Sequence, residues 1–230
     1  MTFPKDTAVV VVHGAWADGS SWNAVILPLQ QKGLRVIAAP IPLTSLGDDA
    51  AALKRTLERT KGPLILAGHA YAGAVIGAVN DERVKALVYI AGLAPDEGET
   101  VAQVFYRDER HPQAPQLAPD GDGLIWMPEE GFGNAFAQHA TADQIALSAA
   151  VQRPIALRCI QELVPNPAWK SKPSWFLIAE EDRMINPKTQ HFMAERMKAT
   201  IHAFKVDHTP LLTAPVEVAN IILEAARATL

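Results

Sequence analysis

The sequence predicts an α/β protein in which a mostly parallel sheet of about six strands is covered by helices on both faces. Three observations predict this fold class. Short apolar runs rich in β-branched residues alternate along the chain with longer amphipathic runs. The short runs are continuously apolar, as expected of parallel strands that are buried on both faces. The 230 residues, 49% apolar and 20% charged, suffice for one large globular domain with an insertion.

Each predicted strand is a short apolar run bounded by turn or charged residues. Functional residues are expected at the carboxyl ends of these strands, because ligands bind beyond that edge of a parallel sheet. The strands are expected at 8–12, 35–39, 64–67, 84–91, 175–179 and 201–206.

The predicted helices combine apolar residues at helical spacing with start and stop signals. Gly33 follows the first helix as a stop signal. Asp48 and Asp49 lie in the first turn of the second, where acidic side chains complement the helix dipole. Pro215 opens the last helix, at a position where proline is tolerated. The helices of the core are expected at 21–32, 46–60, 70–80, 188–198 and 215–228.

The alternation of strands and helices stops between residues 95 and 172, a stretch rich in proline and aromatic residues. A long insertion that leaves and re-enters the sheet at its carboxyl edge covers that edge, and long insertions are usually functional. We therefore predict a core formed by residues 1–94 and 173–230 and a cap formed by residues 95–172. Within the cap, one helix is expected over 142–153.

Four aromatic residues are candidates for the lining of a substrate pocket under this cap. They are Trp16 of the core and Trp126, Phe132 and Phe136 of the cap. Their apolar rings would suit an apolar or aromatic ligand group. The alternative for each of the three cap residues is that it only packs the cap onto the core.

The motif Gly68-His69-Ala70-Tyr71-Ala72-Gly73 follows an apolar strand and opens a helix of small residues. Strand, glycine turn and helix are the setting of a nucleophile elbow, in which a serine stands on a strained turn. Here the nucleophile position holds Ala70, whose methyl group cannot attack a substrate.

The remaining parts of a serine hydrolase site occur at strand ends in the chain order nucleophile, acid, histidine. His208 lies just after the last predicted strand and is the candidate base. Asp182 follows the preceding strand and is the candidate acid that orients the base. Glu180 and Glu181 are rivals by proximity to Asp182, and Asp96 is a rival because its strand end also faces the site.

Two backbone amides are candidates for holding an oxyanion. One belongs to Tyr71, the residue after the nucleophile position, and the other to Ala15 in the loop after the first strand. Gly14 in that loop lets the backbone approach a ligand closely. The glycines of this chain do not match phosphate-loop or dinucleotide fingerprints, and no metal-ligand spacing occurs, so neither cofactor nor metal is expected.

Together, the segment 12–16, the motif 68–73, the segments 94–99 and 182–187, and His208 resemble the α/β-hydrolase superfamily. Within it, the chain is similar to the compact branch of plant methylesterases, hydroxynitrile lyases and bacterial esterases such as pyrethroid hydrolases. The resemblance covers essentially the whole chain. It implies an α/β-hydrolase fold with a cap and a serine-type ester or lactone hydrolase that acts through an acyl-enzyme.

By this resemblance, Ala70 stands where the serine nucleophile belongs, Asp182 matches the acid, His208 the base, and Ala15 and Tyr71 the oxyanion donors. Because the other parts are retained, we hypothesise that alanine was engineered at position 70 to trap a substrate or product. The alternative is a natural pseudoenzyme that binds a ligand without chemistry.

A hydroxynitrile lyase is the second functional hypothesis. In plant lyases of this branch, a threonine follows the first histidine and a lysine follows the catalytic histidine. Those positions hold Gly14 and Thr209 in this chain. No cation is present there to stabilise a leaving cyanide, which favours the esterase.

Composition excludes several other classes of partner. The 21 basic and 25 acidic residues give a net charge of −4 without a basic stripe, which argues against nucleic-acid binding. No apolar run approaches the length of a membrane span. The single cysteine, Cys159, rules out an intrachain disulfide, and we expect a reducing, cytoplasmic location. A small-molecule ester or lactone is the expected partner, and a homodimer is compatible with the sequence.

Overall fold

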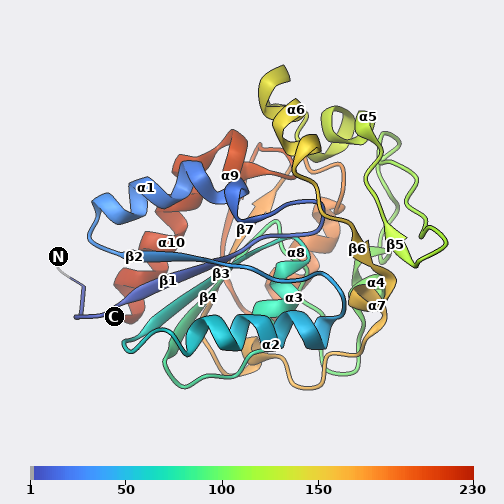
Figure 1. Ribbon diagram of the computed structural model, residues 1–230. Coiled ribbons are helices and arrows are strands. Elements are labelled where there is room, and N and C mark those ends of the chain that lie inside the picture. The colour runs from blue at the N-terminus through green and yellow to red at the C-terminus, as the bar shows by residue number, and fades with distance from the viewer. Residues whose placement is uncertain (1–2) are drawn as a thin grey trace.

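The computed structural model describes residues 3–230 and confirms the predicted fold class. Six parallel strands form one sheet in the order β2-β1-β3-β4-β7-β8 (Figure 1). Every residue of β1, β3 and β7 is buried, as expected of strands covered on both faces. The bounds of the strands are β1 (Ala8–Val12), β2 (Arg35–Ala39), β3 (Leu64–His69), β4 (Val84–Ile90), β7 (Ser174–Ala179) and β8 (Thr200–Phe204).

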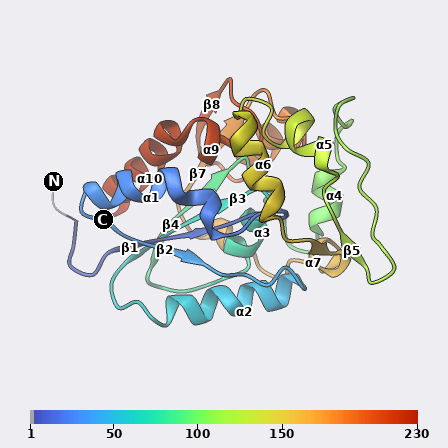
Figure 2. The same cartoon turned by 45° about the horizontal axis from the view of Figure 1, so that its top comes forward.

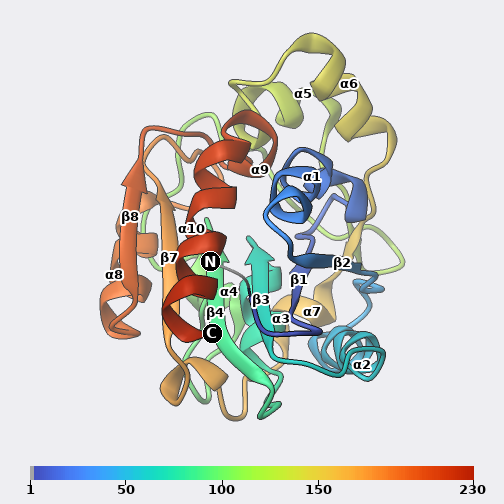
Figure 3. The ribbon, with the colours of Figure 1, turned by 90° about the vertical axis from the view of Figure 1, so that its left-hand side faces the viewer.

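Two groups of helices cover the two faces of the sheet (Figure 3). The helices α1 (Asn23–Gln31) and α10 (Pro215–Thr229) pack against each other and against one face. The helices α2 (Leu46–Leu57), α3 (Ala72–Gly77) and α8 (Pro187–Arg196) cover the other. Among residues 3–230, no helix has both the length and the apolar character that crossing a bilayer requires.

The segment 95–172 contains eight short elements. Figures 1 and 2 show α5 and α6 beyond the ends of the strands. These elements are α4 (Val101–Phe105), β5 (Leu124–Ile125), α5 (Glu129–Gly131), η2 (Phe132–Phe136), α6 (Ala142–Ala150), β6 (Ile155–Ala156), α7 (Leu157–Gln161) and η3 (Ala168–Lys170). Sequence patterns predicted only α6 among them, because the others are too short to show a period.

Hydrogen bonds fix this segment to the loops of the core. The Arg153 carbonyl accepts from the amide of Trp16 at 3.1 Å, and its guanidinium donates to the carbonyl oxygen of Ile41 at 2.9 Å. The amide of Ala156 donates to the carbonyl oxygen of Leu43 at 2.9 Å. The loops after β1 and β2 are therefore both hydrogen-bonded to residues 153–156 of the insertion.

One boundary differs in an informative way from the sequence prediction. The helix expected over 70–80 begins only at Ala72 and ends at Gly77, while β3 continues to His69. Ala70 has φ +48°, which lies outside the right-handed helical region. The chain therefore makes a tight turn at Ala70 between β3 and α3, and the helix does not begin directly at the end of the strand.

Candidate active site

Ala70 occupies a tight turn at the carboxyl end of β3. Its φ of +48° places it in the left-handed region, which residues other than glycine rarely adopt and which costs free energy unless neighbours hold it. The amide of Ala70 donates to the carbonyl oxygen of Ile90 at 3.1 Å, and its carbonyl accepts from the amides of Gly73 at 3.0 Å and Leu93 at 2.9 Å. These bonds hold the strained conformation, as expected of a nucleophile elbow.

Two glycines allow the backbone to pack this closely. A Cβ atom on Gly68 would lie 2.6 Å from the carbonyl oxygen of Ala72, so no larger residue fits without moving the turn. A Cβ atom on Gly14 would lie 3.0 Å from the carbonyl oxygen of His69 and 3.2 Å from the Cβ atom of Ala70. Gly14 therefore lets the loop after β1 approach the nucleophile position.

His208 and Asp182 form a buried pair at the same edge of the sheet. Nδ1 of His208, in the loop between β8 and α9 (Pro210–Thr213), lies 2.8 Å from Oδ2 of Asp182, which follows β7. The two side chains are 2% and 0% exposed. The carboxylate therefore receives the Nδ1 hydrogen and leaves Nε2 as the basic nitrogen of the ring.

Asp182 is held rigidly by further donors. Its Oδ1 accepts from the amides of Met184 at 2.7 Å and Ile185 at 2.9 Å, and its Oδ2 accepts from the side-chain amide of Gln190 at 2.7 Å. Gln190 is fully buried on α8. Sequence analysis missed Gln190, although its position on the buried face of a helix eight residues after Asp182 could have suggested it.

The rival carboxylates have other partners. Asp96 forms an ion pair with Lys170 at 2.7 Å. Glu180 and Glu181 each lie within 3.1 Å of a histidine other than His208. The geometry therefore brings Asp182, and none of these three carboxylates, to the imidazole of His208.

Two amides point to an oxyanion site beside Ala70. Within residues 3–230, the backbone N–H groups of Ala15 and Tyr71 donate to no other protein group, and both residues line the same cavity as Ala70. The neighbouring amide of Trp16 is engaged with the insertion. Unpaired N–H groups on two residues that line one apolar cavity are suited to a developing negative charge on a ligand oxygen.

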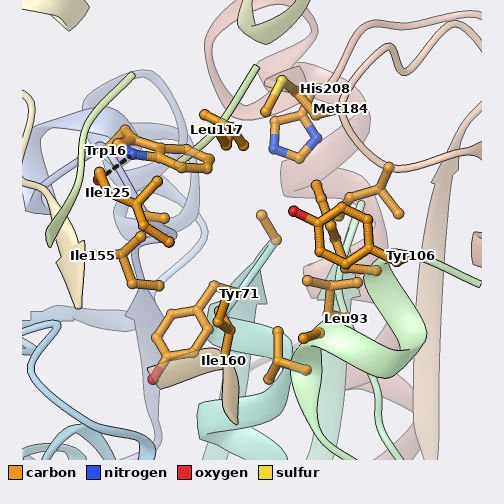
Figure 4. A pocket seen from close by; sticks show the side chains of 16 residues that line it. Trp16, Tyr71, Leu93, Tyr106, Leu117, Ile125, Ile155, Ile160, Met184 and His208 are labelled. Carbon is orange, nitrogen blue, oxygen red and sulfur yellow. Dashed lines mark hydrogen bonds between the residues drawn. The ribbon is translucent and has the colours of Figure 1, made fainter. Parts of the chain in front are cut away.

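The cavity that contains Ala70 and His208 has a volume of about 60 Å³ and is mostly aliphatic (Figure 4). Figure 4 shows the imidazole of His208 at its upper end and the hydroxyl of Tyr106 pointing inward. In the described part of the chain, no group of three or more His, Cys, Asp or Glu side chains is arranged to hold a metal ion. The lining residues are Ala15, Trp16, Ala70, Tyr71, Leu93, Val101, Ala102, Phe105, Tyr106, Leu117, Ile125, Ile155, Ile160, Met184, Ile185 and His208.

Of the four aromatic residues expected in the pocket, only Trp16 lines this cavity. Its indole N–H donates to the carbonyl oxygen of Ile125 at 2.9 Å. Trp126 is corrected to a surface position, because it is 46% exposed and its indole N–H donates to Asp120. Phe132 is fully buried and packs on Phe136 instead of facing the ligand space.

Phe136 packs against the ring of His208 and does not line the cavity. Its ring centroid lies 5.3 Å from that of His208, 6.4 Å from that of His69 and 6.3 Å from that of Trp16. The hydroxyl of Thr209 also donates to the backbone carbonyl of Phe136. The alternative kept for the cap aromatics, that they join the cap to the core, therefore applies to Phe136.

A second buried network surrounds the side chain of Tyr71, whose amide is a candidate oxyanion donor. Its hydroxyl donates to Oδ2 of Asp49 at 2.6 Å, and Oδ1 of Asp49 accepts from the amide of Leu43 at 2.7 Å. The thiol of Cys159 lies 3.7 Å from the same carboxylate. Burial raises the pKa of Asp49, and burial with the nearby carboxylate raises the pKa of Cys159 to about 12. Cys159 is thus a buried thiol, and Asp49 joins α2, the elbow and α7.

Comparison with known proteins defines the family. Residues 9–221 match the model of the Alpha/beta hydrolase family, and the chain belongs to that family. No curated protein sequence matches it.

Solved structures of similar fold cover almost the whole chain at low identity. A pyrethroid hydrolase from Sphingobium faniae JZ-2 is 19% identical with a TM-score of 0.80, over 96% of this chain and 98% of that one. A methylesterase from Arabidopsis is 16% identical with a TM-score of 0.77, over 96% and 99%. An extracellular α/β-hydrolase from a Paenibacillus species is 20% identical with a TM-score of 0.79, again over 96% and 99%. At this identity, the likeness shows a shared fold.

Proposed function

We propose that the chain carries the site of a serine-type carboxylic ester or lactone hydrolase with alanine in the place of the nucleophile. As it stands, it binds small apolar esters or lactones with little turnover. The observation that carries this proposal is the buried 2.8 Å pair of His208 and Asp182, in which His208 lines the same cavity as Ala70 on its strained turn. The names of the similar structures, which include a pyrethroid hydrolase and a methylesterase, support ester chemistry.

With serine at position 70, each part of the site has a defined task. Nε2 of His208 removes the hydroxyl proton while the oxygen attacks the ester carbonyl, and Asp182 stabilises the resulting imidazolium. The amides of Ala15 and Tyr71 hold the oxyanion. His208 then returns the proton to the leaving alcohol, and a water molecule activated by the same base releases the acid.

Alanine at position 70 stops this series of reaction steps at the bound complex. Loss of the nucleophile in such a triad lowers turnover by about a million-fold, to a level supplied by binding and the oxyanion site. Two origins of Ala70 are proposed: engineering to trap a ligand, and descent as a natural ligand-binding protein. The chemistry expected of this chain is the same for both.

The test is the Ala70→Ser variant, assayed with aryl esters and lactones beside the unaltered chain. We expect hydrolysis to rise by about a thousand-fold or more, and to disappear again in the double variant Ala70→Ser/His208→Ala. A folded Ala70→Ser protein that binds an aryl ester but hydrolyses none of these substrates would reject the proposal.

The lyase alternative is tested in the same experiment with a cyanohydrin. The position after His208 holds Thr209, a neutral residue whose hydroxyl is bonded to Phe136. We therefore expect no cyanide release from the Ala70→Ser variant. Cyanide release without ester hydrolysis would make the lyase the better assignment.

A further inference from the structure

The cavity retains a complete general base without a nucleophile. His208 is the only imidazole among its lining residues, and no carboxylate or lysine lines it. Its partner Asp182 accepts four hydrogen bonds, from two backbone amides, Gln190 and His208 itself. Nothing in this arrangement requires serine for the imidazole to accept a proton.

The position of the base relative to the two free amides decides which proton it can take. In acyl transfer, the serine oxygen lies between the base and a carbonyl carbon whose oxygen is held by the amides. With the methyl group of Ala70 at that point, a carbonyl oxygen can still bind the amides of Ala15 and Tyr71. Nε2 of His208 then faces the bound ligand instead of a serine hydroxyl. The ligand atom next to it is the carbon adjacent to the carbonyl.

We infer that the unaltered chain is a general-base catalyst that removes a proton from the carbon adjacent to the carbonyl of a small apolar ketone. This activity rests on the same base and oxyanion assignment as the proposed function, but it needs no nucleophile. A ketone is the appropriate class because it has no leaving group, so that hydrolysis cannot compete.

The step balances without any co-reactant. The α C–H bond breaks and its proton passes to Nε2 of His208. The electron pair forms a carbon–carbon double bond while the carbonyl π pair moves to oxygen, where the amides of Ala15 and Tyr71 hold the enolate. Asp182 stabilises the imidazolium. Return of a proton from the ring, after exchange with solvent, regenerates the ketone with its α-hydrogen replaced.

The apolar walls favour this chemistry and limit the ligand. Aliphatic side chains such as Leu93, Ile125 and Ile160 line the cavity, and an apolar surrounding strengthens the interaction between the amides and the enolate oxygen. The mostly apolar lining suits an alkyl ketone without charged groups. A positioned general base contributes about a hundred-fold or more to such a proton transfer.

The experiment follows the α-proton signals of 2-pentanone by proton NMR in deuterated buffer with catalytic amounts of protein. We expect the unaltered chain to exchange these protons at least about a hundred-fold faster than His208→Gln, and Asp182→Asn to be slowed as well. The matched control His111→Gln removes an exposed histidine and should exchange at the unaltered rate. Circular dichroism confirms that each variant is folded.

Two outcomes overturn the inference. Exchange no faster than that of His208→Gln rejects it, and so does exchange that falls equally in His111→Gln. If Ala70→Ser hydrolyses esters while the unaltered chain exchanges no α-proton, the proposed function stands and only the ketone chemistry fails. If neither reaction occurs, the roles of His208 and of the two amides are rejected together.

Discussion

Nε2 of His69 lies 2.8 Å from the backbone carbonyl oxygen of His208. Because a carbonyl oxygen only accepts hydrogen bonds, Nε2 carries the hydrogen and Nδ1 is the unprotonated nitrogen. The residue before Ala70 thus holds the backbone of His208, the candidate base. Burial, with a smaller contribution from the charge of His208, lowers the pKa of His69 to about 3, so its ring remains a neutral donor near pH 7.

Replacing His69 by glutamine should make folding less sensitive to acid. The unfolded chain binds a proton at this histidine near pH 6.5, whereas the folded chain does so only near pH 3. The stability contributed by His69 is therefore complete above pH 6.5 and is lost as the pH falls toward 3. Between pH 7 and pH 5 the free energy of unfolding falls by about 2 kcal/mol through His69. The His69→Gln variant should not show this decrease.

Urea unfolding at pH 7 and pH 5 measures this difference. His111→Gln, at an exposed position, is the control and should lose as much stability as the unaltered chain. If His69→Gln shows the same loss between the two pH values as that control, the buried neutral ring is not a source of acid sensitivity.

The choice of Asp182 as the acid is tested in the Ala70→Ser background. Asp182→Asn should lower kcat by about ten-thousand-fold, because an amide facing Nδ1 favours the wrong imidazole tautomer. Asp96→Asn should change kcat by less than about threefold, since its carboxylate is paired with Lys170 at 2.7 Å. A larger loss in Asp96→Asn than in Asp182→Asn would show that the acid was chosen wrongly.

The sheet and the positions of Ala70, Asp182 and His208 after strand ends were predictable because both follow from local patterns. Buried parallel strands are continuous apolar runs, and site residues directly follow strand ends. Asp182 and His208 lie in the loops that follow β7 and β8. The order of strands and the burial of the pair at 2.8 Å required the coordinates.

The contributions of the cap could not be predicted in the same way. Trp126 and Phe136 have the composition of pocket residues, yet Trp126 is 46% exposed and Phe136 packs behind His208. Which side of a short, irregular element faces the ligand depends on tertiary contacts and leaves no period in the sequence. Asp49 was interpreted only as a helix-dipole residue, because its bond to Tyr71 spans 22 positions.

Asp49 gives the free energy of unfolding a pH dependence whose sign is opposite to that of His69. Burial raises the pKa of Asp49, so the unfolded chain ionises it at lower pH than the folded chain does. The associated stability is complete below the ordinary carboxyl pKa and is lost as the pH rises through the raised value. Asp49→Asn should therefore lose less stability than the unaltered chain as the pH rises above 4.

Urea unfolding from pH 4 to pH 8 measures the slope of the free energy of unfolding against pH. This slope does not depend on how stable the variant is at any single pH. Asp143→Asn, at an exposed position on α6, is the matched control and should keep the original slope. An unchanged slope in Asp49→Asn would mean that this carboxyl group titrates alike in the folded and unfolded chain.

Tyr106 is expected to select ligands that carry a polar atom. Its hydroxyl points into a mostly apolar cavity (Figure 4) and, within residues 3–230, has no protein hydrogen-bond partner. A ligand oxygen within reach would gain a hydrogen bond worth about 1 kcal/mol. Tyr106→Phe should therefore weaken the binding of an ester by about fivefold.

The same substitution should leave the binding of an alkene of equal shape unchanged, because the phenyl ring keeps the apolar contacts and removes only the hydroxyl. Calorimetric titration of both ligands measures the difference. Trp126→Phe alters an aromatic residue outside the cavity and should affect neither. Equal weakening for ester and alkene in Tyr106→Phe would assign the residue to packing, since a lost hydrogen bond can weaken only the ligand that has an acceptor.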